Sequence, residues 1–163
     1  MAEQPKVIVR PATTEDLDAL SVLNAFVQSL HVRLEPEVFR TDVDAVELRA
    51  FFAALIDKPD TGLLIAEISA EPVGYLWFDL QERLPTVLTQ ARRRIYVQHI
   101  AVRESARRSG VATALLHAVE ANARTKNVTQ LVLDAWTRNE EALRFFQGRG
   151  FRPFNVLLTK VLG

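Results

Sequence analysis

The residues best suited to bind an anion stand at the start of a helical pattern in the second half of the chain. Arg107, Arg108 and Ser109 precede Gly110 there, and the apolar run "VATALL" follows directly. The first N–H groups of a helix lack intrahelical partners, and that end of the helix is partly positive. Glycine allows close approach to the backbone, and arginine makes charge-assisted hydrogen bonds to phosphate oxygens. One interpretation is a pyrophosphate site; the other is an ordinary strand-to-helix connection with exposed arginines.

Other chemistries find little support in the sequence. Neither G-x-x-x-x-G-K-[ST] nor G-x-G-x-x-G is present. The absence of cysteine excludes a disulfide, a thiolate nucleophile and cysteine-bound zinc, and the three histidines do not have metal-site spacing. Twenty basic and twenty acidic residues give zero net charge, so nothing favours a global attraction to nucleic acid or to an anionic membrane. We therefore expect no metal, no nucleic-acid partner and no membrane partner.

Sequence periodicity predicts the elements that must position this turn. Strands are expected at 7–10, 62–69, 72–80, 94–102, 130–136 and 150–162, and helices at 13–30, 43–56, 109–126 and 139–149. The segment 94–102 is almost continuously apolar, as is typical of a central strand covered on both faces. An irregular stretch at 81–94 is long enough to be a working loop. Helices and strands alternate in the second half, whereas 62–80 forms a hairpin, so we expect an α/β fold with a mixed sheet.

Length and composition indicate one globular domain. A chain of 163 residues with 48% hydrophobic and 25% charged residues has the composition of a soluble protein with a single core. The N-terminus does not have the pattern of a signal peptide, and no apolar run approaches the roughly 18 residues of a membrane span. We expect a cytoplasmic protein with one domain at 7–163 after a short extension at 1–6.

Two ordered motifs resemble the GNAT superfamily of N-acetyltransferases. "HIAVRESARRSGVATALL" resembles its acetyl-CoA-binding segment, in which [RQ]-x-x-G-x-[GA] falls on Arg107 to Ala112. "WTRNEEALRFFQGRGF" resembles its second signature, N-x-x-A-x-x-[FY]-[FY]-x-x-x-G-F, on Asn139, Ala142, Phe145, Phe146, Gly150 and Phe151. The resemblance extends from about Val7 onward. It implies the acyl-CoA N-acyltransferase fold, a mostly antiparallel, twisted sheet of six or seven strands flanked by about four helices.

The resemblance also implies a co-substrate, acetyl-CoA, and residues that bind it. The backbone of Ile100 and Val102 is implied to bind the pantetheine arm by pairing with it as a neighbouring strand would. The pyrophosphate is implied to bind to the backbone of Arg107, Arg108, Ser109, Gly110, Val111, Ala112 and Thr113. Asn139 would bond the cofactor near the arm, while Ala142 and Phe145 would shape its exit path. A helix N-cap is an equally compatible role for Asn139, and a core position is the alternative for Phe145.

The implied chemistry is direct attack of an amine on the acetyl thioester. Phe146 stands where many family members have a tyrosine that protonates the leaving thiolate. Strand alternation predicts Tyr96 and Gln98 on the face of Ile100 and Val102, which favours a water relay through Tyr96 and Gln98. Alternation places His99 on the opposite face unless a bulge intervenes. One interpretation of His99 is a catalytic group, because histidine has a pKa near neutral pH, and the other is a structural histidine with satisfied hydrogen bonds.

The acceptor is expected to be a small-molecule or peptide amine. His31 and Glu35, in the loop between the first two helices, lie where family members contact acceptors, although a solvated loop is the alternative interpretation. Trp77 and Trp136 are expected in the core. An N-acetyltransferase is therefore predicted, with a catalytically silent acyl-CoA-binding sensor or interaction module as the alternative. The resemblance is also compatible with a homodimer.

Overall fold

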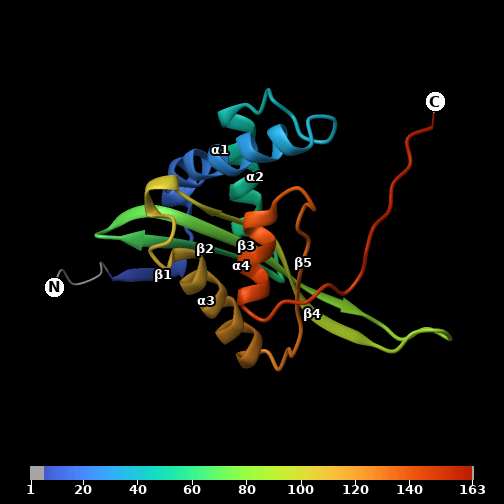
Figure 1. The fold of residues 1–163 in the computed structure, drawn as a ribbon. Helices are drawn as coiled ribbons and strands as arrows, with labels where there is room; N and C mark the ends of the chain where they lie inside the picture. The colour runs from blue at the N-terminus through green and yellow to red at the C-terminus, as the bar shows by residue number, and fades with distance from the viewer. Residues whose placement is uncertain (1–5, 163) are drawn as a thin grey trace.

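The computed structural model describes residues 6–162 and has one five-stranded sheet with helices on both faces (Figure 1). Its strands are β1 (Val7–Pro11), β2 (Thr61–Ile68), β3 (Glu71–Arg83), β4 (Arg92–Val102) and β5 (Leu131–Leu133). Its helices are α1 (Leu17–Leu34), α2 (Ala45–Ile56), α3 (Val111–Thr125) and α4 (Glu140–Gly148), with 3-10 turns η1 (Thr14–Asp16) and η2 (Glu104–Ala106). The strand order is β1-β2-β3-β4-β5, and all neighbours are antiparallel except β4 and β5. The mixed, mostly antiparallel α/β fold is confirmed, with five strands rather than six or seven.

Two apolar clusters hold the helices against the two faces of the sheet. One joins the sheet to α3 and α4 through buried side chains such as Ile95, Leu115 and Phe146. The other joins it to α1 and α2 through side chains such as Leu20 and Tyr75. No helix within residues 6–162 is both long and apolar enough to span a membrane.

Helix α1 is longer than its apolar pattern predicted. Thr13 and Asp16 form a capping box at the start of η1, which leads into α1, and the guanidinium of Arg10 donates to the Asp16 carboxylate over 2.8 Å. Arg10 holds the pKa of Asp16 below its usual value through this hydrogen bond. The helix continues through Leu34, so the prediction that His31 lies in a loop was wrong, because the polar residues that suggested a loop belong to the last turn of the helix.

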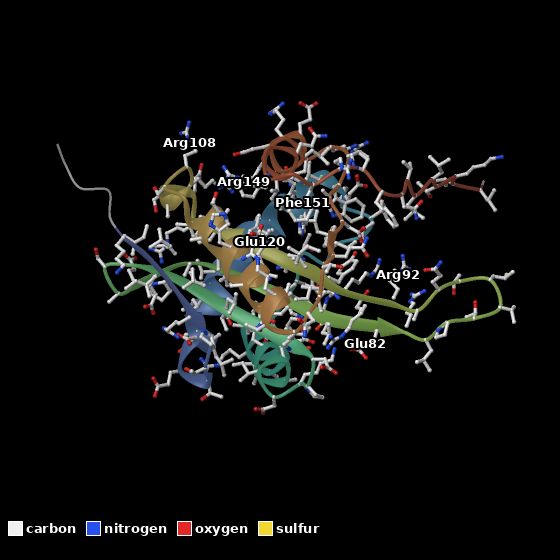
Figure 2. The ribbon with its side chains drawn as sticks, turned by 90° about the horizontal axis from the view of Figure 1, so that it is seen from below. Glu82, Arg92, Arg108, Glu120, Arg149 and Phe151 are labelled. Carbon is white, nitrogen blue, oxygen red and sulfur yellow. The ribbon has the colours of Figure 1, made fainter. Side chains whose placement is uncertain are left out.

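Strands β3 and β4 form a long hairpin arm. Pairing continues to Arg83 and Arg92, so the loop expected over 81–94 shortens to 84–91. Glu82 and Arg92 lie on this arm in Figure 2, and the arm projects well beyond the helices. The arm lengthens because oppositely charged side chains such as Glu82 and Arg93 pair across it.

Two predicted strands near the C-terminus are shortened or absent. Strand β5 spans three residues rather than 130–136, and Trp136 lies beyond it, 36% exposed rather than in the core. No strand forms over 150–162, although residues 152–162 are described. A strand needs a neighbour to pair with, and this segment runs away from the sheet (Figure 1).

Candidate active site

The sheet opens between β4 and β5. Only residues 95–97 pair with 131–133, after which β4 continues to Val102 while β5 ends. Within the described part of the chain, the edge of 98–102 that faces this opening has no strand partner. An unpaired strand edge can accept an extended ligand as if it were a further strand. The predicted arm contacts Ile100 and Val102 both lie on this segment.

The turn that follows β4 leaves the start of α3 uncapped. Arg108 and Gly110 adopt left-handed backbone conformations, with φ of 62° and 82°. Gly110 occupies the N-cap position, supplies no side-chain hydrogen bond, and has no heavy atom within 4 Å of where a Cβ would stand. The first N–H groups of α3 therefore have no capping partner within residues 6–162. This is the geometry in which a helix start binds an anion.

The predicted phosphate-binding residues differ in the solvent exposure of their side chains. Arg107, Arg108, Ser109 and Gly110 are exposed, Ala112 and Thr113 are half-buried, and Val111 is buried in the core. The Arg108 side chain points outward from the turn (Figure 2). Val111 can therefore contribute only its backbone, whereas the two arginines are free to add charge.

A surface cavity of about 300 Å³ borders the turn. Ser105 and Ser109 line it on one side, and Ser69 and Glu71 of the β2–β3 connection line it on the other. The guanidinium of Arg103 forms an ion pair with Glu71 across this space. Of the residues 107–113, only Ser109 lines this cavity.

A bulge at Gln98 overturns the face assignment expected for β4. Trp77 pairs with His99 and Phe78 with Val97, so Gln98 is an extra residue. Side chains at positions 95, 97, 100 and 102 consequently all pack into the cluster under α3. The expectation that Tyr96 and Gln98 share a face with Ile100 was therefore wrong. Tyr96 and His99 instead share the α1/α2 face.

A buried polar chain links α1 to β4 through β3. The Asn24 side-chain amide donates to the Tyr75 hydroxyl over 2.9 Å, and that hydroxyl is hydrogen-bonded to Nδ1 of His99. Because Tyr75 accepts from Asn24, its own proton is available to Nδ1, which leaves the proton of a neutral imidazole on Nε2. Burial, helped by the nearby His31, lowers the pKa of His99 to about 4. His99 is thus neutral near pH 7, and Nε2 is a donor in this arrangement.

The two residues of the predicted relay each contact a carboxylate that sequence reasoning missed. The Tyr96 hydroxyl donates to Asp134, immediately after β5, and the Gln98 amide donates to Asp79 over 2.8 Å. Burial and the Asp134 hydrogen bond raise the pKa of Tyr96 to about 12. Tyr96 is therefore a phenol at neutral pH, and each relay residue donates a hydrogen bond to an aspartate side chain. The signal available in the sequence for Asp134 was a carboxylate within the otherwise apolar segment predicted as a strand at 130–136.

A row of rings connects β4 to the segment that follows α1. The His31 ring lies 5.5 Å from the His99 ring and 4.6 Å from the Phe39 ring, and Phe39 in turn lies 5.5 Å from Trp136. Burial lowers the pKa of His31. His31 thus lies close to His99, in the same face of the molecule.

Glu35 ends α1 and faces the segment beyond β5. The Arg138 side chain donates to the Leu34 carbonyl over 3.2 Å, and its guanidinium lies 4.0 Å from the Glu35 carboxylate. Glu35 and His31 therefore border one surface, which is also bordered by Trp136.

The predicted residues of the last helix have local structural roles. Asn139 is the N-cap of α4, and its side-chain oxygen accepts from the Ala142 amide over 3.2 Å. Ala142 and Phe145 are half-buried against the α3-side core. The N-cap role of Asn139 is thus shown by the structure, whereas its contact with a cofactor stays a prediction.

A family model described as the acetyltransferase (GNAT) family matches residues 25–151, which is more than half of the chain. The chain belongs to this family. An N-alpha-acetyltransferase from Sulfurisphaera tokodaii is 31% identical over 114 residues, a match that covers 66% of each protein and so leaves about a third of each outside it.

Solved structures show the same fold at lower identity. A tetramutant of a Bacillus halodurans protein superposes with a TM-score of 0.88 at 23% identity, covering 95% of this chain and 99% of that one. An aminoglycoside antibiotic 6'-N-acetyltransferase from Acinetobacter baumannii superposes with a TM-score of 0.68 at 23% identity, covering 97% and 100%.

In this GNAT domain the second aromatic of the final signature lies inside the core. Phe146 is 7% exposed, and its ring stands 5.3 Å from that of Phe145 and 5.6 Å from that of Phe151. Residues 6–162 contain no cluster of three or more histidine or carboxylate side chains that could hold a metal ion.

Proposed function

We propose that this GNAT domain transfers an acetyl group from acetyl-CoA to a primary amine. The observation that carries the proposal is the continuity of two binding features along one stretch of chain. The unpaired edge of 98–102 leads directly into the turn and the uncapped start of α3. An extended amide-containing arm suits the first feature, and a pyrophosphate suits the second.

The residues present fit this co-substrate. The backbone at Ile100 and Val102 would hold the pantetheine arm. The pyrophosphate would lie against the backbone of Arg107, Arg108, Ser109, Gly110, Val111, Ala112 and Thr113. Gly110 keeps the approach open, because no heavy atom lies within 4 Å of its Cβ position. Asn139, Ala142 and Phe145 would border the exit path of the arm, with Asn139 retaining its cap.

Acetyl-CoA supplies an activated acyl group, so the protein needs mainly to orient a neutral amine and to accept its proton. Tyr96 with Asp134 and Gln98 with Asp79 offer two hydrogen-bonded routes for that proton, through water, toward carboxylates. Burial, helped by the nearby His31, lowers the pKa of His99 to about 4, so its ring is neutral when the amine attacks. Phe146 has no proton to give, and a thiol of ordinary pKa near 8.5 can leave as the thiolate at modest cost.

The acceptor would approach from the α1/α2 face, past His31 and Glu35. Relatives of similar fold are named for different amine acceptors, one an N-alpha-acetyltransferase and another an aminoglycoside 6'-N-acetyltransferase. Both names specify transfer to nitrogen, which supports a small-molecule or peptide amine as the acceptor class.

The alternative, an acyl-CoA-binding module without turnover, draws on one specific observation. Phe146 replaces the tyrosine donor, and His99 and Tyr96 of β4 have pKa values of about 4 and about 12. Neither titrates near neutral pH. Release of free coenzyme A thiol in the presence of a panel of amines separates the two functions: steady release requires an enzyme, and binding without release requires the module.

Gly110→Glu tests the cofactor site, with Gly150→Glu as the matched control. Both glycines have left-handed φ values, 82° and 87°, and open space at the Cβ position, so the two variants carry similar backbone strain and the same charge. We expect Gly110→Glu to lose acetyl-CoA binding in calorimetry because its carboxylate stands where phosphate approaches, while Gly150→Glu keeps it. Equal affinity in both folded variants would remove the pyrophosphate from this turn.

A further inference from the structure

The hairpin arm of β3 and β4 carries its charges unequally on its two faces. On the face toward α3, Arg93 forms an ion pair with Glu82 across the arm and donates to the Lys126 carbonyl at the end of that helix. Neighbouring residues of a strand point to opposite faces, so Arg92 and Arg94 lie on the other face of the arm, the α1/α2 face. The α3 side of the arm is thus balanced in charge by its own side chains.

Three arginines gather on the α1/α2 face without an acidic partner. Arg92, seen on the arm in Figure 2, lies directly opposite Arg83 in the register of β3 and β4, and Arg94 lies opposite Gln81. The Arg94 guanidinium donates to the Gln81 side-chain oxygen over 2.9 Å. Within residues 6–162, none of the three arginines forms an ion pair with an aspartate or glutamate. We call Arg83, Arg92 and Arg94 the arginine cluster.

The charges of the arginine cluster act on one another. Burial, followed by the charges of Arg92 and Arg83, lowers the pKa of Arg94. Like charges directly opposite each other destabilise a sheet. An anion bound between them would remove this repulsion, and guanidinium groups bind carboxylate and phosphate through charge-assisted, bidentate hydrogen bonds. The cluster is therefore a favourable place for a carboxylate or phosphate group.

The arginine cluster continues directly into the candidate active site. The guanidinium carbon of Arg94 lies 5.5 Å from the centroid of the Tyr96 ring, and the Tyr96 hydroxyl donates to Asp134. Asp79 lies opposite Tyr96 in the register. A strand rises about 3.4 Å per residue, so Arg94 and Arg92 lie about 7 Å and about 14 Å along β4 from Tyr96. One face of the sheet thus presents acidic side chains at the relay and basic side chains farther out.

We propose that the arginine cluster binds an anionic group of the acceptor, which is then an amine with a carboxylate or phosphate about 7–14 Å from its nitrogen. This inference rests on the proposed acetyl transfer and names the class of acceptor for it. Such an amine is complementary in charge to this face, with its nitrogen toward Asp134 and its anionic group toward the arm. A short peptide with acidic side chains and a small amino acid of suitable length share this chemistry, whereas a polycation such as an aminoglycoside is repelled by the cluster.

Initial rates of thiol release test the acceptor class with pairs of acceptors that differ only in charge. The peptides Ala-Ala-Glu-Glu and Ala-Ala-Gln-Gln, both with amidated C-termini, form one pair, and ω-aminooctanoate and its amide form the other. We expect the acidic member of at least one pair to have a kcat/KM about tenfold higher, because two exposed ion pairs correspond to an affinity change of that order. A preference confined to the first pair identifies a peptide acceptor, and one confined to the second identifies a small molecule.

Arg83→Gln combined with Arg92→Gln tests the cluster itself. This double variant removes two like charges that face each other, so it should be no less stable in urea titrations than the unmodified chain. We expect it to raise KM for the preferred acidic acceptor about tenfold, with kcat and the KM of the uncharged member unchanged. Arg93→Gln combined with Arg124→Gln is the matched control, since it removes the same charge from the α3 side, and it should change neither KM.

The outcomes separate this inference from the function on which it rests. Thiol release at equal kcat/KM within both pairs, or an unchanged KM in the Arg83→Gln, Arg92→Gln variant, would overturn the acceptor class and leave acetyl transfer standing. No thiol release with any amine would refute the proposed function and the acceptor class together. If the double variant loses binding to a single-stranded DNA oligonucleotide while its KM is unchanged, the cluster binds nucleic acid and the inference is wrong.

Discussion

Acidification should destabilise this protein through His99, by an amount that its burial sets. In the folded chain the pKa of His99 is about 4, because the ring is buried and lies near His31. In the unfolded chain it should be near 6.5. A folded-state pKa that is depressed means that the unfolded state binds more protons between these values. Stability is therefore fully present above pH 6.5 and is lost as the pH falls toward 4.

The magnitude follows from the distance between the two pKa values. Lowering the pH from 7.5 to 5 crosses about 1.5 units of that range at about 1.36 kcal/mol per unit, so the free energy of unfolding should fall by about 2 kcal/mol. The lowered pKa of His31 contributes in the same direction. Asp16, whose pKa is lowered from 3.8, loses its contribution only at more acidic pH, outside this window.

Urea unfolding at the two pH values, at one protein concentration, measures the effect. His99→Gln should show a much smaller loss than the unmodified chain, because only His31 still contributes. His117→Gln is the matched control, since His117 is exposed on α3, and it should lose as much as the unmodified chain. If the full loss persists in His99→Gln, the buried neutral histidine is not its source.

Two further predictions concern the last helix and the proton route. Asn139→Ala removes the N-cap of α4 and should lower the free energy of unfolding by about 1 kcal/mol in urea titrations; an unchanged value would mean that the bond to the Ala142 amide contributes nothing. If the relay carries the proton, the rate of thiol release should rise with pH toward the pKa of the acceptor amine, with no inflection near 6.5, and Asp134→Asn should slow it more than Tyr96→Phe, which keeps the carboxylate. A pH inflection that disappears in His99→Gln, together with most of the activity, would instead identify His99 as the base.

The sequence predicted those parts of the candidate site whose structure is local. The turn at 107–113 could be identified because a helix start, a glycine and paired arginines are all visible within a few residues. The start of α4 at Asn139 could be identified for the same reason, since an N-cap depends on the next three residues. Each of these features needs no knowledge of what lies across the sheet.

Features that depend on distant pairing were missed. Asp134 and Asp79 reach the relay residues only because β5 and β3 flank β4, a register that no local pattern contains. The lengthened arm also depends on cross-strand pairs, and the missing strand at 150–162 depends on the lack of a neighbour. The bulge had a faint signal, since Gln98 and His99 are two successive polar residues in an otherwise apolar strand.

That bulge decides how the two halves of the site are separated. Uninterrupted alternation would place Tyr96 and Gln98 on the face of Ile100 and Val102, toward α3. It would place His99 on the opposite face, apart from Tyr96 and Gln98. One extra residue keeps the side chains at 95, 97, 100 and 102 in the cluster under α3 and puts Tyr96 and His99 together on the α1/α2 face. The edge of the same strand remains free from position 98 onward. In the proposed function, a single strand would offer its edge to the pantetheine arm and its polar face to the acceptor, because the extra residue falls where the sheet opens.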